Sequence, residues 1–456
     1  MQEVEGTDDR HPWLRLEELA EREAWSEVRE LLEALDEPTQ VLAAAHLPPE
    51  TLAAVLGAIG PEQAAELIEN LPEVQAASAV EAIEPGAAAE ILEELPSDER
   101  ADLLGRMNPE EVDAILSEAD AELRDEARAL LVYQPDTAGG LMATECFTVS
   151  DGWTVEQVVR RIRSRGDFAD HQIQYVYVLD PRRRLVGVVP LRALIVARPE
   201  QAVVEVMIPD PLSVRADTAL KELGEFFDHH GFLGVPVTDD EGRLLGIVHR
   251  PAVEEEQAET AQADHMKSLG IASGEELRSM PLLLRSGRRL SWLSVNILLN
   301  VLAASVIAAY QETLQAAIAL AVFLPMISDM SGCSGSQAVA VSLRELSLGV
   351  RRPNELVQVW LKEVTLGALN GLALGVLIGL VALVWQGNVA LGVVVGGALA
   401  LNTVVAVSIG GTIPLLLRRL GQDPALASGP VLTTITDVCG FFLALSFATV
   451  MLDRLT

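Results

Sequence analysis

The stretch GPVLTTITDVCGFFLALSFATVML, residues 429–452, is apolar apart from several hydroxyl groups and one acidic residue, Asp437. A helix of roughly 20 such residues crosses the hydrocarbon core of a bilayer, so we predict that this stretch spans a membrane. An ionised carboxylate is costly in hydrocarbon, and by default it marks a water-filled or ion-lined path. The alternative is an isolated carboxylate that hydrogen-bonds to a neighbouring helix.

Four further apolar stretches lie upstream of this one. Helices in soluble cores rarely reach such lengths without charges, and here the stretches follow one another. We therefore expect residues 290–456 to form an all-α polytopic membrane domain with five transmembrane helices. The third helix has glycine at every fourth position, which permits close helix packing. The upstream stretches are residues 290–310, 316–343, 364–385 and 389–417, and the glycines are Gly367, Gly371, Gly375 and Gly379.

Charge divides the chain sharply between its two ends. The 456 residues contain 33 Lys+Arg and 66 Asp+Glu, a formal net charge of −33. Residues 1–290 hold 26 of the basic and 58 of the acidic side chains, whereas residues 291–456 hold 7 and 8. Phosphate groups repel a region as acidic as residues 1–290. This charge argues against nucleic acid as a partner and favours cations.

Basic residues predict the orientation of the spans, because they accumulate in cytoplasmic loops. They precede the first span and lie between the second and third and between the fourth and fifth. We therefore expect the N-terminus in the cytoplasm and the C-terminus outside a cell (inner) membrane. The start, MQEVEGTDDR, has no basic or apolar region typical of a signal peptide. The basic residues are Arg285, Arg288, Arg289, Arg344, Arg351, Arg352, Lys362, Arg418 and Arg419.

The first 132 residues repeat a proline-punctuated pattern. Pro61, Pro85 and Pro109 are spaced by 24 residues, and proline both ends one helix and is tolerated in the first turn of the next. Each repeat therefore predicts two helices of about eight residues, and residues 1–132 an acidic, all-α superhelical domain. Its carboxylates either serve solubility alone or bind cations.

A second repeat has a period of about 60 residues. YVYVLDPRRRLVGVVPLRAL, residues 175–194, matches LGVPVTDDEGRLLGIVHRPAV, residues 233–253. Each copy predicts strand, helix, strand, turn, strand and helix. The pattern resembles an α+β tandem pair of cystathionine-β-synthase (CBS) domains, which we assign to residues 133–256. The resemblance implies a nucleotide site, but the Thr or Ser and the ribose-binding Asp of that site are replaced, so we disfavour ATP. Pro190 and Ala193 stand there in the first copy, His249 and Ala252 in the second.

The order of these parts resembles the MgtE family of magnesium channels over essentially the whole chain. Three segments carry the resemblance: YQPDTAGGLM at residues 133–142, LPMISDMSGCSGSQ at residues 324–337 and DPALASGPVLTTITDVCGFF at residues 423–442. The resemblance implies a homodimeric channel or transporter that admits Mg²⁺ passively and is gated by cytoplasmic Mg²⁺. No Walker motif, catalytic triad or cofactor fingerprint is present, so we expect no enzyme. Cys146, Cys333 and Cys439 form no zinc or disulfide pattern.

In a two-fold dimer, two Asp437 side chains facing each other would repel, and a divalent cation would relieve that repulsion. Mg²⁺ keeps most of its waters, so one carboxylate per subunit with carbonyl and hydroxyl groups suits it. In the second span we expect Pro325 to break the helix around Asp329; the alternative is a packed kink. The residues expected to contact the ion are Asp437, Asp329, Thr433, Gly429 and Gln337.

Residues 257–289 are expected to form a connecting helix that, by the resemblance, plugs the pore. Glu255 and Asp264 match acidic positions at which family members sense Mg²⁺, whereas Ala252 replaces an Asp. The alternative is that these charged residues form only a solvated helix face. Cys333 replaces an Asn of the family pattern, and thiol is a softer ligand than an amide oxygen. The alternatives are therefore a path for Co²⁺, Zn²⁺ or a monovalent cation, or a CBS membrane sensor that transports nothing.

Overall fold

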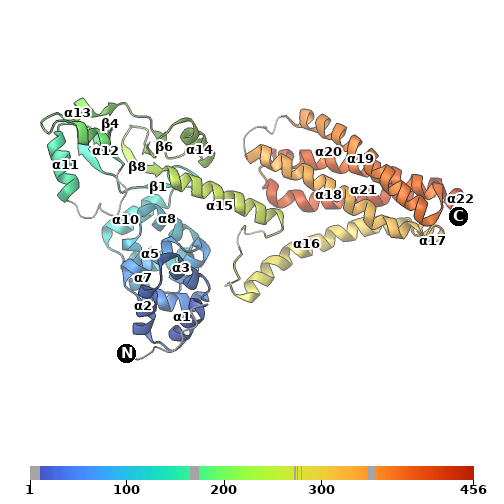
Figure 1. Cartoon of the computed structure of the whole chain (residues 1–456), viewed down its shortest axis with the longest axis horizontal. Helices are drawn as coiled ribbons and strands as arrows, with labels where there is room; N and C mark the ends of the chain where they lie inside the picture. The colour runs from blue at the N-terminus through green and yellow to red at the C-terminus, as the bar shows by residue number, and fades with distance from the viewer. Residues whose placement is uncertain are drawn as a thin grey trace, which may run out of the picture. The chain divides into compact units, whose positions relative to one another are not determined.

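The computed structural model describes residues 11–164, 174–271, 274, 276–278, 280–347 and 355–455 (Figure 1). The chain divides into two compact units. The first contains Met1–Thr260 with Leu277–Met280, and the second contains Ala261–Glu276 with Pro281–Thr456. Arg351 and Arg352, which entered the prediction of orientation, lie outside the described residues.

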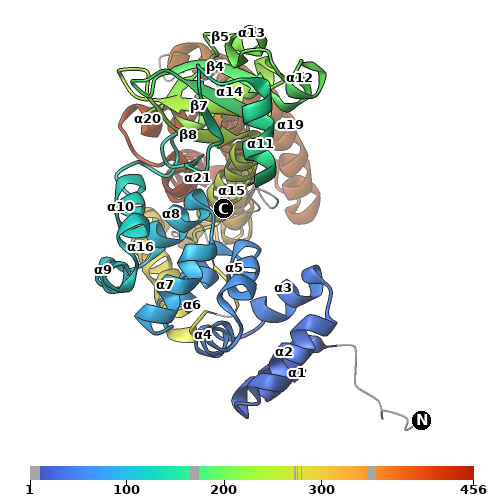
Figure 2. The same cartoon turned by 90° about the vertical axis from the view of Figure 1, so that its left-hand side faces the viewer.

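The first unit begins with ten short helices, stacked as Figure 2 shows. Each has 8 to 10 residues, which confirms the prediction from the proline spacing. Leucine, isoleucine and alanine side chains from successive helices share one continuous core. The helices are α1 (Pro12–Glu21), α2 (Trp25–Ala34), α3 (Glu37–Ala45), α4 (Pro49–Ala58), α5 (Pro61–Glu69), α6 (Glu73–Val80), α7 (Pro85–Glu94), α8 (Ser97–Arg106), α9 (Pro109–Glu118) and α10 (Ala121–Leu130).

A recurring side-chain cap closes the ends of three of these helices. The last carbonyl groups of a helix lack partners within it. Arg100 donates from Nε to the carbonyl eight residues earlier and from Nη2 to the carbonyl five residues earlier, both at 2.8 Å. Gln40 and Arg124 bond the carbonyls at the same two spacings. Each of these three side chains thereby ties its own helix to the helix before it.

Two four-stranded sheets follow, and each takes an edge strand from the other half of the pair. The orders are β2-β3-β4-β5 and β1-β8-β7-β6. The strand, helix and turn order of both copies confirms the repeat. The elements are β1 (Met142–Ala143), β2 (Thr148–Ser150), α11 (Val155–Ser164), β3 (Tyr175–Leu179), β4 (Leu185–Pro190), α12 (Leu191–Val196), α13 (Val203–Val206), β5 (Ile208–Pro209), β6 (Val214–Arg215), α14 (Leu220–His229), β7 (Gly234–Thr238) and β8 (Leu244–His249).

One glycine in each copy makes this strand exchange possible. Gly187 pairs with Val178 and Gly246 with Val237 in the same register of the two sheets. A Cβ at Gly246 would lie 2.7 Å from the carbonyl oxygen of Ala143, in the exchanged strand β1. A side chain at this position would push the edge strand away, so the repeated glycine belongs to the packing of the pair.

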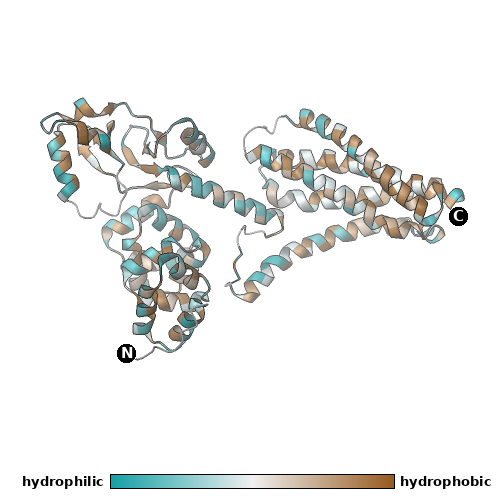
Figure 3. Cartoon of the chain, in the orientation of Figure 1, coloured by the Kyte–Doolittle hydropathy of each residue, from teal (hydrophilic) through white to brown (hydrophobic). Residues whose placement is uncertain are grey.

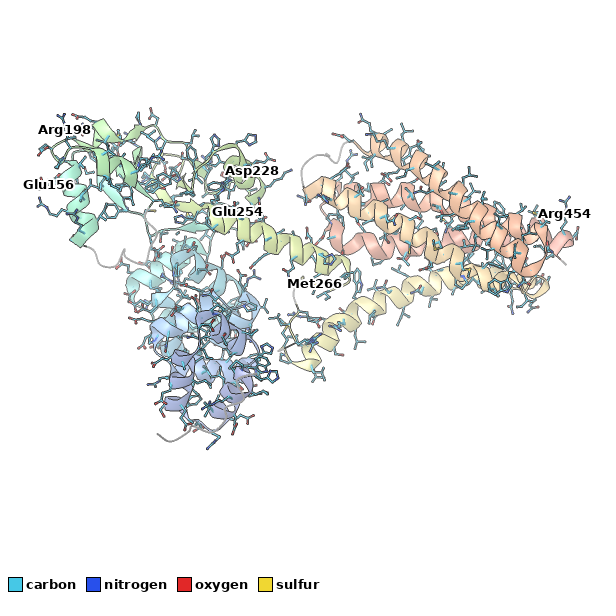
Figure 4. The ribbon with its side chains drawn as sticks, viewed as in Figure 1. Glu156, Arg198, Asp228, Glu254, Met266 and Arg454 are labelled. Atoms are coloured by element: carbon cyan, nitrogen blue, oxygen red, sulfur yellow. The ribbon has the colours of Figure 1, made fainter. Side chains whose placement is uncertain are left out.

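Helix α15 (Arg250–Ser268) follows β8, and Figure 4 labels Glu254 near its start and Met266 near its end. The prediction of one connecting helix over residues 257–289 is wrong, because α15 ends at Ser268 and α16 begins at Leu282. Gly270 has φ +91°, a conformation that side chains rarely adopt, and a Cβ there would also meet the Trp292 ring. The next helix begins directly after Pro281.

The second unit is built from long helices, and apolar residues predominate along them in Figure 3. Within the part of the chain that the structure describes, four are long and apolar enough to cross a membrane: Leu282–Ala309, Leu356–Gln386, Val389–Arg419 and Ser428–Val450. The five predicted spans are thus not confirmed over the described residues. The helices are α16 (Leu282–Ala309), α17 (Gln311–Ala316), α18 (Leu320–Ser347), α19 (Leu356–Gln386), α20 (Val389–Arg419), α21 (Pro424–Val450) and α22 (Leu452–Leu455).

Helix α18 contains the predicted second span, and it differs from the prediction in one respect. It is a continuous helix of 28 residues with Pro325 inside it, so the predicted break around Asp329 is wrong. Pro325 lies in the second turn, so its missing N–H removes only one hydrogen bond, near the start of the helix. The polar residues of α18, among them Ser328 and Ser331, lower its hydropathy below that of the other four.

Helix α20 lies at the centre of the second unit and packs against α18, α19 and α21. The glycine stripe of α19 faces it: a Cβ at Gly371 would lie 2.4 Å from the Ala400 carbonyl oxygen, and one at Gly375 2.5 Å from that of Gly396. The two backbones approach too closely for any side chain between them, which confirms that the stripe serves helix packing.

Candidate functional site

Asp437, the acidic residue of the last long helix, is half-buried against α18. Its Oδ1 accepts a hydrogen bond from the hydroxyl of Ser328. The two residues come from helices that are far apart in the sequence, and α21 and α18 lie directly beside each other. A carboxylate bonded to one hydroxyl keeps further lone pairs for a cation or its waters.

A buried polar contact lies next to this pair and joins three helices. Asn402 of α20 is fully buried, and its Nδ2 donates both to the hydroxyl of Ser331 on α18 and to the carbonyl of Thr436 on α21, the latter at 3.0 Å. Ser331 and Thr436 are themselves 0% exposed. The Asn402 Oδ1 has no hydrogen-bond partner among the described residues. Sequence reasoning missed Asn402, which sits in an apolar helix without an acidic neighbour.

The threonines before Asp437 bond within their own helix. Thr433 donates to the carbonyl of Gly429 at 3.1 Å, and Thr434 to that of Pro430 at 2.8 Å. Such bonds satisfy the hydroxyl hydrogen and leave the oxygen lone pairs free to accept. Thr433 is exposed and lies one turn before Asp437, whereas Gly429 is half-buried. The predicted Thr433 and Asp437 thus lie on one stretch of α21.

Asp329 and Gln337, the other two residues predicted for the ion path, both lie on α18 and are both exposed in the single chain. Cys333 is exposed between them. No described group of three or more His, Cys, Asp or Glu side chains is placed to hold a metal ion. Of the α18 residues, it is Ser328 that the structure shows bonded to Asp437.

Glu255 and Asp264, predicted as sensors, are both exposed on α15 but belong to different units. The Lys267 Nζ lies 3.9 Å from Oδ1 of Asp264 and 3.3 Å from Oδ2 of Asp423. Desolvation raises the pKa of Asp264, and the charge of Lys267 opposes this shift. Lys267 of α15 thus lies between a carboxylate of its own helix, Asp264, and Asp423, which directly precedes α21.

Glu255 contributes to a larger acidic cluster within the first unit, which we call the α8 cluster. Desolvation, and then repulsion by Asp98, Glu69 and Glu255, raises the pKa of Glu99 to about 8. Desolvation, and then repulsion by Glu73, Glu99 and Glu256, raises the pKa of Asp102 to about 8. A carboxyl group so shifted is easily neutralised, either by a proton or by a cation. The α8 cluster consists of Glu69, Glu73, Asp98, Glu99, Asp102, Glu255 and Glu256.

A cavity of about 320 Å³ opens beside the α8 cluster, between the short helices and the CBS pair. Glu145 from the start of the pair accepts from the Ser97 backbone N–H at 3.0 Å and from its hydroxyl at 2.7 Å, and so caps α8. His249 lies in the cavity, and desolvation lowers its pKa. The lining includes Glu69, Asp98, Glu99, Glu145, Gln174, Tyr175, Tyr177 and His249. Sequence analysis did not foresee this cavity, because its carboxylates come from separate domains.

Family models match the chain in the order of its parts. The MgtE intracellular N domain matches residues 25–96 and 75–136, the CBS domain residues 138–200 and 203–253, and the MgtE divalent cation transporter domain residues 324–447. The magnesium transporter MgtE of Thermus thermophilus is 37% identical over 338 residues, which cover 73% of this chain and 74% of that protein. The chain belongs to the MgtE family. The magnesium transporter MgtE of Bacillus subtilis is 31% identical over 72% of both chains.

Two solved structures are similar to part of this chain. The soluble part of a magnesium transporter is 27% identical and covers 55% of this chain and 98% of its own, with a TM-score of 0.48. The cytosolic domain of the Mg²⁺ channel MgtE in complex with ATP is 34% identical over 54% of this chain and 99% of its own, with a TM-score of 0.41. Within this MgtE chain, the transporter domain contains Asp437, Ser328 and Asn402, and the N domain contains α8 of the α8 cluster.

Proposed function

We propose that this protein is a magnesium channel or transporter of the cell inner membrane, through which Mg²⁺ enters passively. One observation carries the proposal: the segment that matches the divalent cation transporter domain holds a half-buried acid, Asp437, whose carboxylate keeps oxygen lone pairs beyond the one that Ser328 occupies. An inside-negative potential contributes about 2.3 kcal/mol per charge per 100 mV. A divalent ion therefore needs no chemical energy source, and we propose no enzymatic activity.

The path consists of Asp437 and Thr433 on α21 and Asp329 and Gln337 on α18, with Gly429 at its cytoplasmic end. The protein works as a homodimer, in which two-fold symmetry doubles each of these groups. Five crossings, by α16, α18, α19, α20 and α21, place the N-terminus in the cytoplasm and the C-terminus outside. We assign the acidic helical domain to residues 1–132, the CBS pair to residues 133–256, the connecting segment to residues 257–289 and the membrane domain to residues 290–456.

Cytoplasmic Mg²⁺ regulates the path through the α8 cluster and through Asp264 on α15. The raised pKa values of Glu99 and Asp102 support this, since desolvation and then repulsion by neighbouring carboxylates raise them, and a divalent cation would relieve that repulsion. ATP remains disfavoured, because the carboxylates that line the cavity would repel a triphosphate. Nucleic acid is no partner, for the same electrostatic reason.

Uptake into liposomes that contain the purified full chain and a fluorescent Mg²⁺ indicator tests the proposal. Asp437→Asn keeps the shape of the side chain and removes its charge, and we expect it to reduce uptake at least about a hundredfold. Thr449→Val is the control, because Thr449 bonds Thr313 and its own helix instead. Normal uptake by folded Asp437→Asn would refute the proposed path. No uptake by the parent chain would favour a sensor, and faster uptake of Co²⁺ or Zn²⁺ than of Mg²⁺ would favour another cation.

A further inference from the structure

Asn402 carries a buried amide and is not one of the residues proposed to contact the ion. Burying an amide in apolar surroundings is costly unless it is hydrogen-bonded, and here one oxygen, Oδ1, is buried with no partner among the described residues. An apolar residue of similar volume would avoid this cost. Position 402 therefore carries a polar group at the expense of stability. We look for the role of Asn402 in the two hydrogen bonds that its Nδ2 donates.

The contacts of Asn402 flank those of Asp437 on both neighbouring helices. On α21, Nδ2 bonds the carbonyl of Thr436, the residue directly before Asp437. On α18, it bonds the hydroxyl of Ser331, which lies one turn beyond Ser328, the partner of Asp437. The Ser331 hydroxyl in turn donates to the Ile327 carbonyl at 2.6 Å. Asn402 thus fixes the register of α21 against α18 at the acidic residue.

The surrounding backbone leaves room for this amide and for little else. A Cβ at Gly440, one turn after Thr436, would lie 2.7 Å from the Asn402 Nδ2. A Cβ at Gly410 of α20 would lie 2.3 Å from the Gly335 carbonyl oxygen of α18. About two turns along α20 from Asn402, α20 and α18 thus touch through their backbones, so a change in their separation is not taken up by soft side chains and moves the helices themselves.

We infer that Asn402 is a positioning residue for ion recognition: its amide sets the separation of α18 and α21, and so the place of the Asp437 carboxylate. This inference rests on the proposed function. Mg²⁺ demands near-ideal octahedral geometry and keeps several of its waters. The spacing of the groups that receive the hydrated ion therefore decides how well it binds, and a displacement of Asp437 weakens apparent affinity without unfolding the protein.

The test is the Mg²⁺ concentration that half-saturates uptake by the full chain in liposomes, measured with thermal unfolding in detergent. Asn402→Leu keeps the volume and removes both donated hydrogen bonds. We expect it to raise the half-saturating concentration about three- to twenty-fold and to leave the melting temperature unchanged or higher. Ser331→Ala removes one of the two acceptors, and its effect should be smaller and should not add to that of Asn402→Leu.

Thr403→Val is the matched control on the same helix. Thr403 is equally buried, but its hydroxyl bonds the Leu399 carbonyl within α20, at 2.8 Å. It should therefore leave the half-saturating concentration unchanged. An unchanged half-saturating concentration in folded Asn402→Leu would overturn the inference, as would a fall in uptake rate alone. If Asn402→Leu does not fold, an unchanged value in Ser331→Ala overturns it instead.

Asp437→Asn separates failure of this inference from failure of the proposed function. If Asp437→Asn abolishes uptake and Asn402→Leu takes up Mg²⁺ with the parental half-saturating concentration, the inference alone is wrong. If folded Asp437→Asn takes up Mg²⁺ normally, the proposed path is wrong, and the inference falls with it.

Discussion

At the scale of single residues, Glu99 gives the sharpest prediction. Its pKa in the folded chain is raised to about 8, so the folded state binds a proton more tightly than the unfolded state. The resulting stability is fully present near pH 4.5 and is lost as the pH rises toward 8. Glu99→Gln should therefore raise the free energy of unfolding at pH 8 modestly, because solvent screens this exposed side chain, and flatten its pH dependence, measured by denaturant titration in EDTA. Glu110→Gln, at an exposed site of α9, is the control, and a larger gain at pH 5 than at pH 8 would contradict the prediction.

Residues were predictable where their signal is local. Asp437 stands out because it is an acid in an apolar stretch. The sequence therefore predicted that this side chain lies inside the helical bundle, as it does. Its partner Ser328 and the amide of Asn402 were not, because serine and asparagine in a span bond their own helix as readily as another. The α8 cluster depends on carboxylates of α8 and α15, which the sequence separates widely.

At the scale of elements, the helix cap made by Arg100 predicts a large cost of substitution. Arg100 is 6% exposed, bonds two carbonyl groups at the end of α7, and pairs with Glu126 at 3.1 Å. Arg100→Ala leaves these buried acceptors without donors and should lower the free energy of unfolding by about 2 to 4 kcal/mol. Hydrogen exchange of α7 and α8 amides in the full chain measures this loss. Arg128→Ala, which removes an exposed pair with Asp113, should change it by less than about 0.5 kcal/mol, and an equal loss in both variants would contradict the cap.

The elements themselves show which signals a sequence carries. Proline spacing predicted the short helices because proline acts on its own backbone. The same reasoning failed twice in the longer helices. Pro325 does not break α18, since it lies in the second turn, where little of the hydrogen-bonded ladder depends on it. Helix α15 ends without any proline, because Gly270 adopts a positive φ against the Trp292 ring.

At the scale of the whole molecule, the path of the chain depends on α18. If α18 crosses the membrane, five crossings leave the α19–α20 connection and the C-terminus both outside. If α18 stays on one side, four crossings bring both into the cytoplasm. The four strongly apolar helices do not decide between these topologies, whereas the polar face of α18 against α20 and α21 suits a helix that crosses and lines a path.

Cysteine labelling decides this point. In a background with Cys146, Cys333 and Cys439 replaced by serine, Gln386→Cys and Asp453→Cys place single thiols in the α19–α20 connection and near the C-terminus. We expect a membrane-impermeant maleimide to label both on intact cells with the outer membrane opened. Ser26→Cys, in α2, should react only after the inner membrane is permeabilised. Protection of Gln386→Cys and Asp453→Cys in intact cells would instead show four crossings, and would place Asp329 and Gln337 of α18 outside any path across the bilayer.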